Sequence, residues 1–257
     1  MTHQIKSYIK FIFKSTNQHG VHSPFVFNLV TKCFYDKQDY EAYKQILNYK
    51  KNVLKNRTKI RVTDLDVGSQ ATNNTEYFIS EIAKNARTTH KRAKLLYRLA
   101  NYFKFENILE LGTSLGIATH AISLANPNVN IITIEGCQDI LEFNKNNFRE
   151  HDLEKVHLIA GDFKHGIKGL TPMTFDLIFF DVNAQKDAAL DYFESLIKTI
   201  HNDSVFIFDN IYGSESMTEA WEIIKQHPKV TVTIDVFFWG FVFFRKEQVK
   251  ENFIIRC

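Results

Sequence analysis

The sequence predicts an α/β protein in which a mostly parallel sheet carries helices on both faces. Three observations carry this prediction. From about residue 101, short apolar runs of strand character alternate with helical segments. The run 175–181, Phe-Asp-Leu-Ile-Phe-Phe-Asp, is almost wholly apolar, as expected of a central parallel strand buried on both faces. A strand at 107–111 leads directly into a glycine turn and a helix start.

The elements of this sheet follow in order along the chain. Seven strands are expected, at 107–111, 130–135, 156–160, 175–181, 204–209, 231–238 and 241–245. Helices are expected between them at 117–125, 139–151, 188–200 and 216–226. The last two strands are expected to form a closing pair joined at Trp239-Gly240. The domain boundary is placed near residue 85, with 86–257 as the α/β domain.

Residues 1–85 are predicted to form a mainly helical extension. Four apolar residues share one face of its first expected helix: Ile5, Ile9, Ile12 and Phe13. This face is expected to dock on the body of the protein, and a helix lying on a membrane surface is the alternative. Ser23-Pro24 has the form of an N-cap followed by proline at the first helical position.

Charge divides the chain into a basic head and an acidic body. Residues 1–100 hold 18 Lys and Arg against 7 Asp and Glu, a net of +11, so the total of +3 leaves −8 for the remainder. The stretch from Lys44 to Arg61 carries seven basic residues and no acid. It is interpreted as a solvated helix face or a mobile segment, with a phosphate-binding patch for nucleic acid as the alternative.

The composition excludes several classes of protein. No apolar stretch approaches the roughly 18 residues that span a bilayer. Lys6, Lys10 and Lys14 interrupt the apolar positions that a signal peptide would need. Three distant cysteines (33, 137 and 257) argue against a disulfide framework or a cysteine zinc site. A cytoplasmic location is therefore expected.

The turn at 112–116 predicts a nucleotide-like cofactor. Gly112 and Gly116 flank Ser114 between a strand and a helix start, where backbone can approach a ligand closely. The spacing departs from the dinucleotide fingerprint. Acids also lie at the ends of five successive strands or just after them, at Glu110, Glu135, Asp162, Asp181 and Asp209-Asn210. Ligands of open parallel sheets bind beyond these strand ends.

These motifs in this order resemble the class I S-adenosylmethionine-dependent methyltransferases, and more closely the cation-dependent catechol and caffeoyl-CoA-type O-methyltransferases. The resemblance covers about residues 86–245 and implies a Rossmann-like sheet. It implies that the cofactor is held by Glu110, Gly112, Thr113, Ser114, Gly116, Glu135, Gly136, Gly161, Asp162, Phe163 and Asp181. Within this set Glu135 would take the ribose, and Asp162 and Phe163 would meet the adenine.

The resemblance also implies a divalent cation, Mg²⁺ or Ca²⁺, on Asp181, Asp209 and Asn210. Such a cation would lower the pKa of an acceptor hydroxyl and position it for methyl transfer. The family's basic residue three positions after the strand-four acid is replaced here by Ala184. Lys186 is the candidate replacement beside Asp181 in catalysis, and His165, the cation alone, or weak activity are the alternatives.

Three functions follow as hypotheses. The leading one is O-methylation of a hydroxylated small molecule. The second changes the acceptor to RNA, for example a hydroxylated tRNA base, because of the basic head. The third is a cofactor-binding or scaffold protein with weakened catalysis, because of Ala184. The apolar strands near the C-terminus also suggest a homodimer through edge pairing.

Overall fold

The computed structural model describes residues 3–63, 74–153, 155–170, 172–182 and 185–257. The chain divides into two compact units, 1–35 with 167–257, and 36–166. We call them the terminal unit and the central unit. In the terminal unit lie α1 (His3–Lys14), α2 (Pro24–Leu29), β6 (Leu177–Phe180), α9 (Lys186–Leu196), β7 (Val205–Asp209), α10 (Glu215–Gln226), β8 (Val232–Asp235), β9 (Trp239–Phe243) and β10 (Glu251–Ile254).

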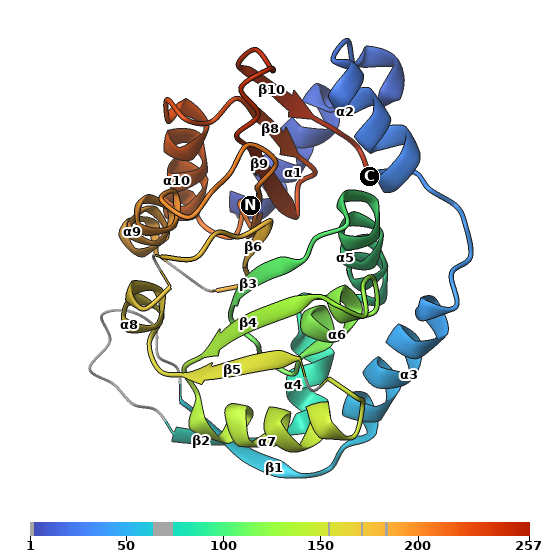
Figure 1. Ribbon diagram of the computed structural model, residues 1–257, viewed down its shortest axis with the longest axis vertical. Coiled ribbons are helices and arrows are strands. Elements are labelled where there is room, and N and C mark those ends of the chain that lie inside the picture. Colours follow the sequence, from blue (N-terminus) through green and yellow to red (C-terminus); the bar gives the residue numbers. More distant parts are fainter. Residues whose placement is uncertain (1–2, 64–73, 154, 171, 183–184) are drawn as a thin grey trace. The chain divides into compact units, whose positions relative to one another are not determined.

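The central unit contains the first three parallel strands of the sheet. Its elements are α3 (Ala42–Lys55), β1 (Lys59–Thr63), β2 (Asn74–Phe78), α4 (Ile79–Asn85), α5 (His90–Phe103), β3 (Asn107–Leu111), α6 (Ile117–Ser123), β4 (Asn130–Glu135), α7 (Gln138–Arg149) and β5 (Val156–Ala160). Strands β3, β4 and β5 lie side by side in that order (Figure 1), and β3 is buried from Ile108 to Leu111. The short helix α8 (Phe163–Lys168) follows β5.

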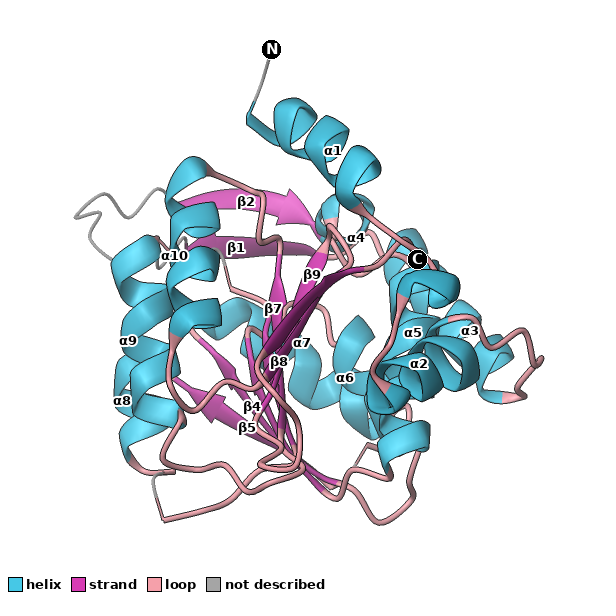
Figure 2. Ribbon diagram, turned by 90° about the horizontal axis from the view of Figure 1, so that it is seen from above, coloured by secondary structure: helices cyan, strands magenta, loops and turns pink. Residues whose placement is uncertain are grey.

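The terminal unit contains five strands in the order β10-β8-β9-β7-β6. Strand β6 pairs parallel with β7, and β9 runs antiparallel between β7 and β8. Helices α9 and α10 cover one face of these strands and α2 lies against the other (Figure 2). Phe193 and Trp221 pack on Phe208 from one side, and Phe25 packs on Phe243 from the other.

The fold class is confirmed: a mostly parallel sheet carries helices on its faces. The described residues contribute eight strands to it, and not seven, because Glu251–Ile254 adds β10 parallel to β8. The expected turn at Trp239-Gly240 is wrong. Trp239 begins β9, and the turn falls at 236–238, where Phe237 has φ of 71°. The extension also includes strands β1 and β2, which form an antiparallel pair.

Helix α1 does not dock through the apolar face that the sequence suggested. Its buried residues are Ser7 and Phe11, whereas Ile5, Ile9 and Phe13 are exposed, Phe13 by 85%. Phe11 packs on Phe237 beside β8, and this contact fixes the side of the helix that turns inward. No helix among the described residues is long and apolar enough to cross a membrane.

Close packing at β9 generates the first prediction. A Cβ on Gly240 would lie 2.7 Å from the ring of Trp221, which is fully buried on α10. We expect Gly240→Ala to lower the free energy of unfolding by roughly 1–3 kcal/mol in urea titrations. Trp221→Phe should recover part of this loss in the double variant, because it removes the colliding ring. Additive losses in the double variant would contradict the assigned collision.

Candidate functional site

The turn between β3 and α6 has the backbone of a ligand cradle. Gly112, Ser114 and Gly116 all have positive φ, of 94°, 48° and 70°. Only glycine fits at position 116, because a Cβ there would lie 2.3 Å from the ring of Phe148 and 2.6 Å from the Tyr49 hydroxyl. Ser114 adopts a left-handed conformation that non-glycine residues rarely take, and such positions cluster at functional sites.

Polar side chains of α3 and α7 form hydrogen bonds to the backbone carbonyls of this turn. The Tyr49 hydroxyl on α3 donates to the Leu115 carbonyl at 2.9 Å and accepts from the Asn147 amide at 2.6 Å. The Asn144 amide on α7 donates to the Ser114 carbonyl at 2.6 Å. These three residues were not singled out from the sequence. Their positions on two helices become meaningful only when the helices pack beside the turn.

Glu110 lies completely buried at the end of β3. Its Oε2 accepts hydrogen bonds from the hydroxyls of Thr119 at 2.6 Å and Thr133 at 2.7 Å, while its Oε1 has no hydrogen-bond partner. Burial raises the pKa of Glu110 to about 7, against the lowering effect of the two threonine hydrogen bonds. A buried acceptor without a donor is costly, so this oxygen is suited to a ligand that brings a donor or a positive charge.

Glu135 ends the neighbouring strand and faces the same turn. Its carboxylate accepts the Ser114 amide N–H at 2.9 Å and the Cys137 amide N–H at 2.9 Å. Burial raises the pKa of Glu135, and the backbone hydrogen bonds from Cys137, Ser114 and Gly136 oppose that rise. The amide of Gly161 donates to the Glu135 carbonyl at 3.1 Å, which places the end of β5 beside the end of β4.

The other predicted cofactor residues of the central unit differ in whether their side chains are exposed and already hydrogen-bonded. The Thr113 hydroxyl is buried against that of Thr133 at 2.7 Å, so only its backbone is offered. Gly161, with φ of 131°, has open space where a Cβ would be. Asp162 is exposed, and its carboxylate accepts from the backbone and ring nitrogens of His165. These bonds lower the pKa of Asp162, outweighing the rise from burial. Phe163 is half-buried.

The three predicted cation ligands lie in the terminal unit. Strands β6 and β7 pair in register from Leu177↔Val205 to Phe180↔Phe208, so Asp181 and Asp209 follow at the same level. Asp209 is buried and accepts the indole N–H of Trp239 at 2.8 Å. Asn210 has φ of 57°, and its side-chain oxygen accepts from Gln4 at 3.4 Å. Two carboxylates and an amide oxygen form a donor set that suits a hard cation.

Among the residues that the structure describes, no group of three or more His, Cys, Asp or Glu side chains is suited to a metal. The predicted set contains only two carboxylates, together with one amide, so this absence does not bear on it. The cation therefore stays a prediction.

Lys186 begins α9 and is engaged elsewhere. Its ammonium forms an ion pair with Glu219 on α10 at 2.8 Å. The hydrogen bond that Lys186 donates to Glu219 raises the pKa of Lys186, which favours the charged form and disfavours service as a base in this arrangement. Ala184, the departure from the family pattern, lies outside the described residues. The catalytic role of Lys186 stays a prediction.

Comparison with known proteins finds methyltransferases among the proteins similar to this chain. Residues 109–211 match a family model described as a methyltransferase domain. This match supports the resemblance to the class I methyltransferases. A curated relative from Rickettsia bellii, a bifunctional methyltransferase, is 25% identical over 224 residues. That alignment covers 83% of this chain and 36% of the relative, so the chain spans about a third of that relative's length.

Solved structures of methyltransferases share this fold at low sequence identity. A methyltransferase from Podospora anserina with bound S-adenosylhomocysteine has a TM-score of 0.59 at 14% identity, covering 88% of this chain and 97% of that one. A Bacillus cereus O-methyltransferase in complex with the same compound has a TM-score of 0.53 at 17% identity, covering 82% and 93%. A putative caffeoyl-CoA O-methyltransferase from Staphylococcus aureus has a TM-score of 0.52 at 19% identity, covering 58% and 80%.

The buried carboxyl of Glu110 generates the second prediction. Its pKa is about 7 in the folded chain against an ordinary value of 4.5, so the unfolded chain loses this proton first as pH rises. Folding stability from this group is complete below pH 4.5 and falls as pH rises to about 7, by about 3 kcal/mol. Urea unfolding should show this fall in the unmodified chain and a flatter profile in Glu110→Gln.

The matched control for this measurement is Glu142→Gln, which changes an exposed glutamate paired with Lys145. It should leave the pH profile of stability unchanged. Equal profiles for the unmodified chain and Glu110→Gln would show that the carboxyl ionises normally in the folded state.

Proposed function

We propose that this chain transfers a methyl group from S-adenosylmethionine to a hydroxyl oxygen of a small-molecule acceptor, with help from a divalent cation. The observation that carries the proposal is the cradle of the central unit. There a turn with three left-handed residues lies between Glu110, with its unpartnered buried oxygen, and Glu135. The family match to a methyltransferase domain and the cofactor-bound structures of similar fold support it.

The residues of the cradle fit the parts of this cofactor. Oε1 of Glu110 would accept from the cofactor's ammonium group, which would also favour the ionised carboxylate. Glu135 would accept the ribose hydroxyls as donors, in exchange for part of its present bonding to the turn. Asp162 and the half-buried ring of Phe163 would take the adenine. When bound, S-adenosylmethionine supplies an electrophilic methyl group on sulfur.

The acceptor side would be organised by the terminal unit. Asp181, Asp209 and Asn210 would hold a Mg²⁺ or Ca²⁺ ion through oxygen atoms, and the indole of Trp239 keeps the Asp209 carboxylate oriented. Such an ion would lower the pKa of an acceptor hydroxyl, so that a protein base need not carry that task alone. Since Glu219 keeps Lys186 protonated, this ion is the better candidate for activating the acceptor.

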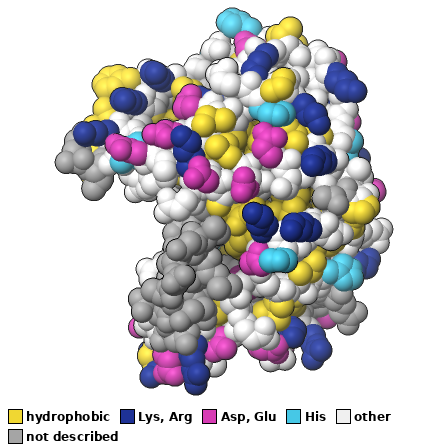
Figure 3. Space-filling model, turned by 90° about the vertical axis from the view of Figure 1, so that its left-hand side faces the viewer, with side chains coloured by type: hydrophobic (Ala, Val, Ile, Leu, Met, Phe, Trp, Pro, Cys, Tyr) yellow, Lys and Arg dark blue, Asp and Glu magenta, His cyan; other side chains and the backbone are white. Residues whose placement is uncertain are grey.

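RNA is the second candidate acceptor, and the net charge of +11 over residues 1–100 is what favours it. The contacts of the basic run weaken this reading. Lys50 donates to the Thr88 carbonyl at 3.0 Å, and its burial, followed by repulsion from Arg92, lowers its pKa. Figure 3 shows one face of the molecule, where basic and acidic side chains are interleaved, and this face does not bear on the basic run. We therefore favour a small molecule. Binding of tRNA that weakens steeply with salt would reverse this choice.

Two further proposals accompany the function. The odd number and wide spacing of the cysteines support a cytoplasmic location. A homodimer through edge pairing stays a prediction, and the apolar strands β8 and β9 that suggested it are paired on both sides within the sheet. A cofactor-binding scaffold is the alternative to an enzyme. Robust turnover on a catechol-like acceptor, lost in Asp181→Ala, would rule out the scaffold.

Cofactor binding generates the third prediction. Isothermal titration with S-adenosylhomocysteine should show one saturable site. Glu135→Gln should weaken it about tenfold or more, because charge-assisted hydrogen bonds to the ribose are worth roughly 1.5–3 kcal/mol. Glu142→Gln on the neighbouring helix α7 is the matched control and should bind normally. No binding by the unmodified chain would contradict the proposed cofactor.

The cation generates the fourth prediction. Methyl transfer to a catechol should stop in EDTA and return on addition of Mg²⁺. Asp209→Asn keeps an acceptor for the Trp239 indole and removes one charge, so activity should fall about a hundredfold while affinity for S-adenosylhomocysteine stays nearly constant. Asp187→Asn, on an exposed residue of α9, is the control. Full activity in EDTA would exclude the cation from catalysis.

A further inference from the structure

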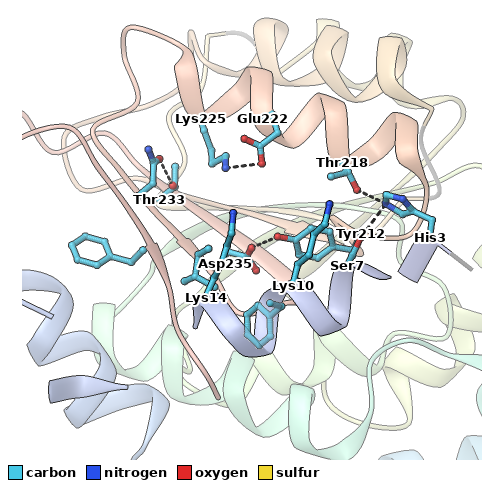
Figure 4. A pocket seen from close by; sticks show the side chains of 14 residues that line it. His3, Ser7, Lys10, Lys14, Tyr212, Thr218, Glu222, Lys225, Thr233 and Asp235 are labelled. Carbon is cyan, nitrogen blue, oxygen red and sulfur yellow. Dashed lines mark hydrogen bonds and ion pairs between the residues drawn. The ribbon is translucent and has the colours of Figure 1, made fainter. Parts of the chain in front are cut away.

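A polar groove lies in the terminal unit, between helices α1 and α10. Its volume is about 350 Å³, within the range of small-molecule sites. His3, Ser7, Lys10 and Lys14 of α1 line one wall, and α10 lines the other. Strands β8 and β10 supply the floor (Figure 4). None of the groove's lining residues belongs to the predicted cofactor or cation sets.

The α1 wall carries two cations that have no counterion among the residues described. Lys10 and Lys14 are exposed, lie one helical turn apart, and point across the groove toward α10 (Figure 4). Within the described part of the chain, neither ammonium forms a hydrogen bond or an ion pair. A third ammonium, that of Lys225, lies on the opposite wall with only 18% of its side chain exposed.

The two acids of the groove are already engaged. Asp235 is buried on the floor and accepts from the Tyr212 hydroxyl and from the Phe237 amide N–H at 2.7 Å. Glu222 pairs with Lys225 at 2.7 Å on α10. Lys10 and Lys14 therefore have no acid of their own inside the groove.

The groove also offers an uncharged donor near these cations. The Ser7 hydroxyl lies 3.4 Å from His3 Nε2, whereas the Thr218 hydroxyl, 2.9 Å from the same nitrogen, already donates to the carbonyls of Ile211 and Ser214. A hydroxyl can donate to a ligand oxygen as readily as it can accept, so it suits an oxyanion beside an ammonium. Cations from both walls, with the Ser7 hydroxyl between the α1 lysines and His3, favour a ligand with several charged oxygens.

We propose that this groove binds the phosphate group of a small organic phosphate, a function beyond the methyl transfer proposed above. Lysine binds phosphate as a point charge, and a phosphate monoester presents three oxygens with a charge between about −1.5 and −2. Lys10 and Lys14 would contact these oxygens from one wall and Lys225 from the other. The Ser7 hydroxyl would donate a further hydrogen bond to the phosphate, and the rest of the groove would hold the organic part.

The test is isothermal titration of the full chain with phenyl phosphate at low ionic strength, beside inorganic phosphate and benzoate. We expect saturable binding of phenyl phosphate at one site and much weaker binding of benzoate. The double variant Lys10→Gln/Lys14→Gln should weaken binding of phenyl phosphate about tenfold or more, a loss of roughly 1.4 kcal/mol or more. Glu222→Gln should strengthen it, because one opposing charge is removed.

Lys6→Gln is the matched control, since Lys6 lies one turn before Lys10 on the same helix and does not line the groove. It should change affinity by less than about twofold. All the exchanged lysines are exposed, and equal thermal midpoints would confirm intact folding. Absence of saturable binding, equal weakening by Lys6→Gln, or equal affinity for benzoate would each overturn the proposal.

Discussion

The backbone of the turn between β3 and α6 is the constraint on which the candidate site depends. It places left-handed residues at 112, 114 and 116, and no side chain fits at 116 against Tyr49 and Phe148. The turn is bound on several sides. Tyr49 donates a hydrogen bond to the Leu115 carbonyl, and Asn144 donates one to the Ser114 carbonyl. The Ser114 amide N–H in turn donates to the Glu135 carboxylate. A change in any of these helices or strands would shift the surface that the turn offers to a ligand.

The buried acids at the strand ends differ in whether the protein itself satisfies their hydrogen-bonding oxygens. Each burial costs free energy that hydrogen bonds must offset. Asp209 accepts a hydrogen bond from the Trp239 indole, and Asp235 accepts hydrogen bonds from the Tyr212 hydroxyl and the Phe237 amide. Glu110 is the contrasting case, because one of its oxygens stays buried without a donor. Under the proposed function this oxygen would accept from the ammonium group of the cofactor.

The N-terminal residues contribute to both compact units. Residues 1–35 cluster with the C-terminal strands, and α3 belongs to the central unit, where it supports the glycine turn. The basic charge of this region is therefore distributed over different surroundings. Lys50 is bonded to a carbonyl beside α5, whereas Lys10 and Lys14 line a groove against α10. Net charge alone could not distinguish these positions.

The sequence by itself determined the alternation of strands and helices, the strands at 107–111, 130–135 and 156–160, and the cradle at Gly112–Gly116. These features are local, because apolar runs, turn glycines and strand-end acids are recognised from residues close to one another in the sequence. Tertiary structure alone decided which face of α1 turns inward, because Phe11 and Ser7 are buried while Ile5, Ile9 and Phe13 stay exposed. It also decided the partners of Glu110, Tyr49 and Lys186. Those partners lie between 9 and 98 residues away in the sequence, on other helices, strands or turns. A charge or a hydroxyl has no sequence pattern that identifies its partner before these elements pack.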